Sequence, residues 1–435
     1  MSNTESDISV ETRRIRAGSS LKGPLLDSEG ILLLAAGTVL SERMKQILID
    51  RDIHVVQISP QDYRSAVQGL PQNSQSSGGI GDQALSASLA AMVNHAGPPF
   101  KDRQQRPGAV PFDPAETERL TKQLAEATTM LELLVRNVQR GMQRDTTPLA
   151  EISSRCLGEL ERDQDQMLAT SIQATDSDMI SSRSLKLSIL GMAVAIELRL
   201  DERAVESIGL CGLIHDWGLY KLPEKLRSNH TPFTDTDWGH YMRHPTMTMD
   251  MLENVHLISP AVRQAAFQVH ELCDGSGYPR GLTKERIHVF ARILGTVDAY
   301  LCFTERRRGR PALVPHDALG CLLHQVPQHR LDGDVVKALL RVVSLFPIGS
   351  LVRLCDDSVA TVIRSDPANY ASPIISTPWR LDGPHPNGLS ATPQGVMDLK
   401  NSGLRIVAAI PSPGKEEMQM PKQLMCDIHW DGPEC

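Results

Sequence analysis

A ten-residue stretch near the middle of the chain constrains its fold more than any other. It reads His-Glu-Leu-Cys-Asp-Gly-Ser-Gly-Tyr-Pro and runs from His270 to Pro279. Its two glycines can adopt backbone angles that are closed to other residues. Pro279 fixes its own φ and favours extended geometry at the residue before it. We therefore expect a helix that carries His270 to end here and to continue into a rigid, shaped loop.

Further histidine and carboxylate groups lie on both sides of this stretch. His215-Asp216 and His244-Pro245 precede it, and Asp298 follows in a Thr-Val-Asp-Ala-Tyr segment. Taken singly, each histidine is better explained as an ordinary core or surface residue. Taken together, imidazole nitrogens and carboxylate oxygens suit a first-row metal ion that promotes hydrolysis. The sequence predicts a metal site with the ligands His215, Asp216, His244, His270 and Asp298.

Apolar residues recur at helical spacing from residue 148 to residue 345. Leu185, Ile189 and Met192 share one helical face, and Val205 and Ile208 share another just before the His-Asp pair. This pattern predicts a mainly α fold with an all-α bundle at its centre. Sites in such bundles lie between facing helices.

The order of these motifs resembles that of the HD-GYP family, which are bacterial metal-dependent phosphodiesterases that hydrolyse cyclic di-GMP. The resemblance covers roughly residues 150 to 345 and implies a helical HD-type bundle. It implies one or two divalent ions, iron or manganese, with Asp216 as the catalytic carboxylate that bridges them. His215 and Asp298 would then bind one ion, and His244 and His270 the other.

Three positions depart from the family pattern. Arg183 stands where the family has a histidine ligand, Val269 replaces a second histidine, and Leu219 replaces a lysine. Arginine has no lone pair to give to a metal, and valine has no ligand atom. Arg183 could instead hold a substrate phosphate directly. Two hypotheses therefore stand: a cyclic di-GMP phosphodiesterase, or a catalytically weakened relative that binds the nucleotide or partner proteins as a scaffold.

The resemblance also suggests substrate and partner contacts. Arg307 and Arg310 resemble a family segment that holds substrate phosphates, although a solvated basic turn is an equal alternative. The family uses the surface that corresponds to Gly277, Tyr278 and Pro279 for partner proteins, including diguanylate cyclases. Local packing of Tyr278 is an equal alternative here. We expect Glu271 and Asp274 to orient ligands or loop amides.

The rest of the chain divides by composition. We expect a small α/β module at 1–60, with strands at 31–35 and 54–58, a helix between them and no regular structure in residues 1–12. A flexible linker follows at 61–112, with a short helix near Leu85 to Met92. Asp113 and Pro114 then begin an amphipathic linker helix at 113–147, which either packs within its own chain or pairs with a second copy in a homodimer. After the bundle at 148–345 we expect a small β appendage at 346–382 and a largely irregular tail at 383–435, with one short strand at 404–409.

Charge and hydropathy exclude several classes. The net charge is −7 and no basic block is present, so we expect no binding to DNA. No apolar run approaches the roughly 18 residues of a membrane span, and the first residues lack the apolar core of a signal peptide. The eight cysteines form no Cys-x-x-Cys pair, which favours reduced thiols. We therefore expect a cytoplasmic protein without membrane contacts.

Overall fold

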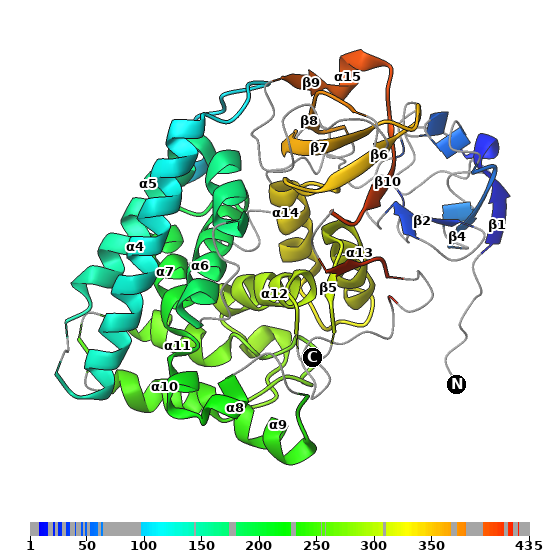
Figure 1. Ribbon diagram of the computed structural model, residues 1–435. Helices are drawn as coiled ribbons and strands as arrows, with labels where there is room; N and C mark the ends of the chain where they lie inside the picture. The colour runs from blue at the N-terminus through cyan, green and yellow to red at the C-terminus, as the bar shows by residue number, and fades with distance from the viewer. Residues whose placement is uncertain are drawn as a thin grey trace, which may run out of the picture. The chain divides into compact units, whose positions relative to one another are not determined.

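The computed structural model shows two compact units, residues 1–80 and 81–435 (Figure 1). It describes residues 8–15, 21, 25–27, 32–34, 40, 45–46, 48–49, 53–59, 62–63, 97–142, 145–173, 180–227, 232–253, 255–256, 258–307, 310–366, 372–379, 395–412, 416–420 and 425. The predicted architecture is confirmed: a mainly α bundle with a small sheet toward each end of the chain. Within these residues, no helix is both long and apolar enough to cross a membrane.

The N-terminal unit contains a four-stranded sheet in the order β1-β4-β2-β3. Its strands are β1 (Ile8–Glu11), β2 (Leu25–Asp27), β3 (Leu32–Leu34) and β4 (Val55–Ile58), and a 3-10 turn, η1 (Thr12–Arg14), follows β1. β3 and β4 confirm the two predicted strands. The expectation was wrong for residues 8–12, because β1 pairs antiparallel with β4 and buries Val10, and residues 1–7 lie outside the described residues. Of the helix expected between the strands, Lys45, Gln46, Leu48 and Ile49 are helical, and the rest lies outside the described residues.

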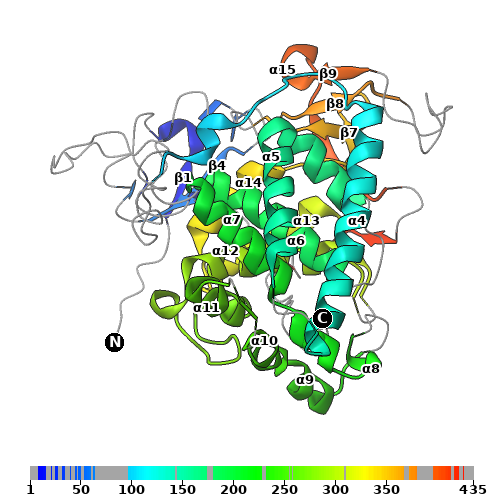
Figure 2. The same ribbon diagram turned by 90° about the vertical axis from the view of Figure 1, so that its left-hand side faces the viewer.

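The second unit is built on a bundle of helices (Figures 1 and 2). In chain order these are α4 (Pro114–Gln139), α5 (Thr147–Gln173), α6 (Ile180–Glu197), α7 (Glu202–Ile214), α8 (Glu224–Arg227), α9 (Asp235–Tyr241), α10 (His244–Leu252), α11 (Pro260–Gln268), α12 (Val289–Thr304), α13 (Pro315–Gln325) and α14 (Gly333–Val343), with the 3-10 turns η3 (Phe100–Arg103), η4 (Trp217–Lys221) and η5 (Lys284–Arg286). α6 is buried along almost its whole length. It packs against α4, α5, α7, α12 and α14 and forms the centre of the core.

Helix α4 begins as its sequence predicts. The Asp113 carboxylate accepts a hydrogen bond from the Ala115 amide at 2.9 Å, and Pro114 occupies the first turn. Its apolar stripe, Leu120, Leu124, Leu131, Leu134 and Val135, is buried in the core of its own chain. The stripe thus packs within the chain, which is one of the two alternatives open from the sequence.

Residues 97–112, the last part of the expected linker, pack on the bundle. Phe100 is buried, and its amide donates to the Leu200 carbonyl at 3.0 Å. Arg103 forms ion pairs with Glu161 and Glu202, both at 2.9 Å. One aromatic anchor and these pairs fix a segment that composition alone marks as a linker. The short helix expected near Leu85 to Met92 lies outside the described residues.

The C-terminal sheet has five strands in the order β10-β6-β7-β8-β9. Strands β6 (Leu351–Leu354), β7 (Val359–Arg364) and β8 (Ile374–Ser376) confirm those expected in the appendage. In the tail, β10 (Ile406–Ile410) confirms the short strand expected at 404–409. The tail is otherwise more ordered than we expected, because β9 (Val396–Asp398) and α15 (Leu399–Ser402) precede β10, and both strands complete the same sheet. Further on, β11 (Glu417–Met418) pairs with β5 (Ala312–Leu313), and Met425 packs against the bundle core.

Candidate metal centre

The end of α7 brings the first two predicted ligands into the core. His215 is the C-terminal cap of α7, and Asp216 precedes the turn η4. A Cβ on Gly218 would lie 2.0 Å from the His244 carbonyl oxygen, so only glycine lets η4 approach α10 this closely. Thr248 of α10 donates its hydroxyl to the His215 carbonyl at 2.9 Å and accepts from the Gly218 amide at 2.8 Å. These contacts hold the His-Asp pair beside the start of α10.

Two of the histidines are oriented by backbone carbonyls. His215 Nδ1 lies 2.9 Å from the Gly212 carbonyl, and His244 Nδ1 lies 2.8 Å from the Tyr241 carbonyl. A carbonyl oxygen can only accept, so each Nδ1 carries the hydrogen. In the neutral imidazole this leaves the Nε2 lone pair available, as a metal ligand requires.

The signature loop supplies His270, two residues after α11 ends at Gln268. Glu271 fixes this loop by accepting hydrogen bonds from the Arg280 amide at 2.7 Å and the Leu282 amide at 2.8 Å. Asp274 accepts from the amide and the hydroxyl of Ser276 at 2.9 and 2.6 Å. Both carboxylates therefore orient loop groups, as we expected.

The Nε2 atoms of three predicted ligands lie beside the carboxylate of the fourth, Asp216. His215 Nε2 lies 3.1 Å from Asp216 Oδ2, His244 Nε2 lies 3.1 Å from Oδ1, and His270 Nε2 lies 3.5 Å from Oδ1. The Nε2 atoms of His244 and His270 are 3.0 Å apart. Donors bound to one metal ion at about 2.1 Å lie about 3.0 to 3.4 Å from each other. The spacing of His244, His270 and Oδ1 therefore matches that of ligands around a single ion, and His215 faces the other oxygen of Asp216.

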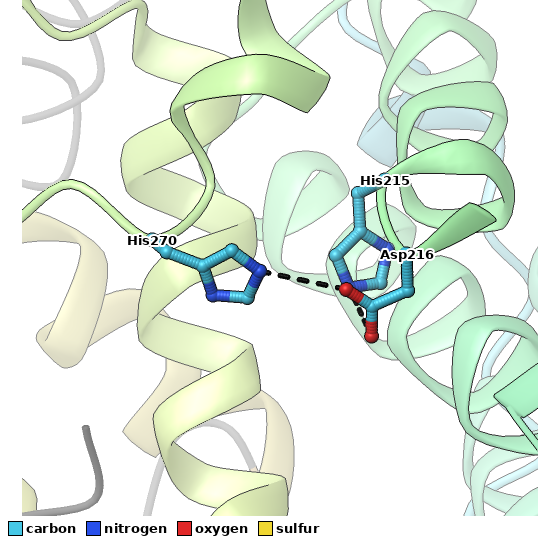
Figure 3. Close-up of side chains that lie close together, drawn as sticks. All are labelled: His215, Asp216 and His270. Carbon is cyan, nitrogen blue, oxygen red and sulfur yellow. Dashed lines mark ion pairs between the residues drawn. The ribbon is translucent and has the colours of Figure 1, made fainter. Parts of the chain in front are cut away.

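Figure 3 shows His270 facing His215 and Asp216 from the opposite side of the centre. Among the described residues, these three offer donor atoms that all lie within 4.8 Å of one another. His215 Nε2 and Asp216 Oδ1 are buried and find no partner at hydrogen-bonding angles in that part of the chain. A buried polar atom without a partner costs about 1–3 kcal/mol. A bound divalent cation would satisfy both atoms, so the residues present fit a metal.

The charges of the centre are tuned by its burial and by mutual contact. Burial alone would raise the pKa of Asp216, but His215 and the other histidines outweigh it and hold the pKa well below its usual range. Burial likewise opposes the charged form of His215, yet the Asp216 carboxylate raises the pKa of that imidazole. For His244 burial prevails and lowers the pKa. Asp216 is therefore an ionised carboxylate among histidines, which is a suitable anion for a cation to bind.

Asp298 of α12 has a different partner from the one we predicted. Its Oδ1 accepts from the Arg183 guanidinium at 2.6 Å, whereas its Oδ2 lies 3.7 Å from His270 Nδ1. Arg183 also donates to Glu305 and to Cys302 Sγ, the latter at 3.2 Å. Burial would raise the pKa of Asp298, but Arg183 outweighs it and the pKa is lowered. Asp298 thus stands at the edge of the centre, paired with Arg183.

Sequence reasoning missed Glu305 and Cys302 as partners of Arg183. They lie seven and four residues after Asp298, so all three share one face of α12. That spacing was the available signal.

Val269 and Leu219, the other two departures from the family pattern, pack among apolar side chains. Val269 is buried in the bundle core. Leu219 packs in a separate apolar cluster with Leu222, Phe233 and Tyr241. Gly295 of α12 explains how close Val269 lies, because a Cβ there would come within 2.5 Å of the Val269 carbonyl oxygen. Neither Val269 nor Leu219 contributes a polar group to the centre.

Tyr278 packs on the centre itself. Its ring stacks on that of His270, with centroids 5.0 Å apart and planes 9° apart, and meets Trp238 edge-on at 5.8 Å. Burial raises the pKa of the Tyr278 hydroxyl well above its usual range. This geometry shows the packing role; partner contact by Gly277, Tyr278 and Pro279 stays a prediction. Sequence reasoning missed Trp238 of α9 as a partner of Tyr278.

Arg310 and Arg307 lie beyond the end of α12. Arg310 donates to the carbonyl oxygens of Cys302 at 2.5 Å and Phe303 at 3.3 Å, where the helix end favours a positive charge. Arg307 is buried, and its amide donates to the Arg310 carbonyl at 3.0 Å. Their contact with substrate phosphates stays a prediction.

Comparison with known proteins agrees with these observations. Residues 166–335 match the model of a family described as HD domain. A cyclic di-GMP phosphodiesterase of Pseudomonas aeruginosa is 26% identical over 281 residues, which is 64% of this chain and 66% of that protein. A 3'3'-cGAMP-specific phosphodiesterase of Vibrio cholerae is 29% identical over 40% of each chain. A cyclic di-GMP phosphodiesterase response regulator of Xanthomonas campestris is 30% identical over 47% of this chain and 53% of its own. The chain thus spans just under two thirds of the first relative and about half or less of the other two.

Proposed function

Since residues 166–335 form an HD domain of the HD-GYP family, we propose that the protein is a metal-dependent phosphodiesterase that hydrolyses cyclic di-GMP in bacterial signalling. One observation carries the proposal: the Nε2 atoms of His215, His244 and His270 lie 3.1 to 3.5 Å from the two oxygens of the Asp216 carboxylate, where a cation can bind. The relatives compared above are named as phosphodiesterases of cyclic dinucleotides.

The donor set favours iron or manganese, because imidazole and carboxylate ligands without thiolates suit these ions. When bound, such an ion neutralises the charge of a phosphodiester and supplies activated water near neutral pH. The protein's own residues hold the ligands in place. The Gly212 and Tyr241 carbonyls fix the imidazoles of His215 and His244, and the low pKa of Asp216 keeps it ionised.

Three arginines supply positive charge for the phosphates of the substrate. Arg183 and Arg307 are both buried near the end of α12 that carries Asp298. Arg310 positions Arg307 through their paired backbones and holds the end of the helix. We place the phosphates of the cyclic dinucleotide against Arg183 and Arg307, with Arg310 completing the basic segment.

The proposal is tested with the full chain loaded with Mn²⁺ or Fe²⁺ and incubated with cyclic di-GMP. Chromatography should show the linear dinucleotide. Asp216→Asn should lower kcat/KM at least about 1,000-fold, because it removes the carboxylate on which the ligands converge. The matched control is Asp250→Asn, which changes an exposed carboxylate on α10 and should leave turnover unchanged.

The same assay distinguishes the alternatives. Turnover of 3'3'-cGAMP in preference to cyclic di-GMP would give this protein the substrate named for the Vibrio cholerae relative. Metal-loaded protein that binds cyclic di-GMP without forming product would establish the scaffold alternative.

A further inference from the structure

We infer that this centre holds one metal ion, and that the Arg183 guanidinium supplies a fixed positive charge where a second ion would otherwise bind Asp298. The inference deepens the proposed function and rests on it for the nature of the site. It assigns Arg183 to the metal centre as a permanent cation.

One compact group of donors lies at one oxygen of Asp216. His244 Nε2 and His270 Nε2 lie 3.1 and 3.5 Å from Asp216 Oδ1 and 3.0 Å from each other, which is the spacing of ligands around one ion. His215 Nε2 faces the other oxygen, Oδ2, at 3.1 Å. A second ion about 3.5–4 Å from the first would bind on this side, where the family pattern gives it His215 and Asp298.

The negative charge of Asp298 is already neutralised by Arg183. Arg183 donates to its Oδ1 at 2.6 Å and to its backbone carbonyl at 3.3 Å. A divalent ion on Asp298 would have to approach this guanidinium, and two positive charges at such a distance repel strongly in a buried site. Asp298 therefore has its cation within the chain.

Several partners hold the Arg183 side chain in this position. Glu305 accepts from its other terminal nitrogen, and Cys302 Sγ accepts at 3.2 Å. Lys186, one turn further along α6, pairs with the same Glu305 at 3.2 Å. The Arg183 side chain is only 12% exposed. Two carboxylates on one face of α12 thus balance a buried arginine, which is a built arrangement and not an incidental surface contact.

Asp298 also connects the Arg183 guanidinium with the metal ligand His270. One oxygen contacts Arg183, and the other lies 3.7 Å from Nδ1 of the ligand His270. The guanidinium is therefore one carboxylate away from a metal ligand. A phosphate bound at the ion lies within the field of both cations, which replaces part of the charge of a second ion.

Metal counting tests this directly. Metal-free full chain is dialysed to equilibrium against Mn²⁺, and bound manganese is measured by mass spectrometry. Wild type should bind one ion, and Arg183→His should bind two, because it removes the guanidinium and adds a ligand. The control Arg155→His makes the same charge change on the exposed face of α5 and should bind one. Two ions on wild type, or one ion on folded Arg183→His, would overturn the inference.

A second variant guards against misfolding of Arg183→His. Asp298→Asn should still bind one ion, with a dissociation constant within about threefold of wild type, whereas Asp216→Asn should lose it. Loss of the ion from folded Asp298→Asn would show that Asp298 is a ligand and contradict the inference. Hydrolysis of cyclic di-GMP by wild type is measured in parallel. Product from protein with two bound ions would contradict the inference alone. One bound ion without product would contradict the proposed function alone.

Discussion

Backbone carbonyls prepare the metal ligands of this centre residue by residue. Gly212 and Tyr241 each accept from the Nδ1 of a histidine three residues further on, which fixes the ring and leaves Nε2 for a ligand. The sequence shows that His215 and His244 are present, but it does not show which ring nitrogen is available. That depends on how the ends of α7 and α9 are turned.

Glu271 illustrates a residue whose role is to hold the loop. Glu271→Gln replaces one of its two accepting oxygens by an amide group that cannot accept from the Arg280 or Leu282 amide. We expect a loss of about 1–3 kcal/mol in the free energy of unfolding, measured by urea denaturation. Glu285→Gln, on an exposed side chain of η5, is the control and should change it by less than about 0.5 kcal/mol. Equal effects from both variants would contradict the loop-holding role.

The sequence was enough to identify the candidate ligands, but it did not show which of them contact one another. Histidine and carboxylate in a fixed order identified five positions, of which three histidines lie beside the two oxygens of a fourth residue, Asp216. Asp298 differs because its partner comes from α6, more than a hundred residues earlier. A cross-chain ion pair of this kind has no local signature, although the spacing of Glu305 from Asp298 offered a hint.

At the scale of elements, two glycines set the distances between the helices that carry the site. Gly218 admits the backbone of α10, and Gly295 admits the carbonyl of Val269 just before His270. Both are helical or turn positions where alanine would ordinarily be tolerated. Their importance arises from the close approach of a neighbouring backbone.

Gly295→Ala should destabilise the protein because its Cβ would lie 2.5 Å from the Val269 carbonyl oxygen, which cannot move without shifting His270. We expect the free energy of unfolding to fall by about 1–3 kcal/mol, together with weaker manganese binding. Gly239→Ala in α9 is the control, since nothing lies within 4 Å of its Cβ. It should be neutral or stabilising by up to about 1 kcal/mol. Equal stability of Gly295→Ala and Gly239→Ala would contradict a role for this close contact.

Sequence patterns predicted the long elements well and the short ones poorly. The start of α4 was clear from Asp113 and Pro114. β1 and β9 were missed because each has only three or four residues, too few for alternation to show. β10 pairs with β6 some fifty residues earlier, so its place in a sheet depends on tertiary contacts.

At the scale of the second unit, the C-terminal sheet is fixed to the bundle through α5. Arg364 at the end of β7 pairs with both oxygens of Asp163 at 2.9 Å and lies over the Phe112 ring. Asp163 has non-helical backbone angles within α5, which mark a kink. Asp165 follows and accepts from the Ser365 hydroxyl at 2.7 Å. Local sequence patterns do not predict this contact, because the residues that make it lie about two hundred positions apart in the chain.

Asp165 should make stability depend on pH. Burial raises the pKa of Asp165 to about 6, from a value of 3.8 when exposed. Between these values the folded chain binds the proton more tightly, so stability falls as pH rises through this window and stays reduced above it. Asp165→Asn cannot ionise. Its unfolding free energy relative to wild type should therefore increase by up to about 3 kcal/mol between pH 4 and pH 7.

Urea denaturation at several pH values measures this difference. The exposed Asp250→Asn serves as the control and should track wild type throughout. A constant difference between Asp165→Asn and wild type across the range would mean that Asp165 is not buried as described.

The most direct test of the whole account is a titration of metal-free protein with Mn²⁺, followed by formation of linear product from cyclic di-GMP. We predict that activity rises with added metal and reaches its plateau at one equivalent per chain, because His244, His270 and Asp216 Oδ1 form one ligand group and Arg183 neutralises Asp298. A plateau at two equivalents, or no product at any ratio, would contradict it.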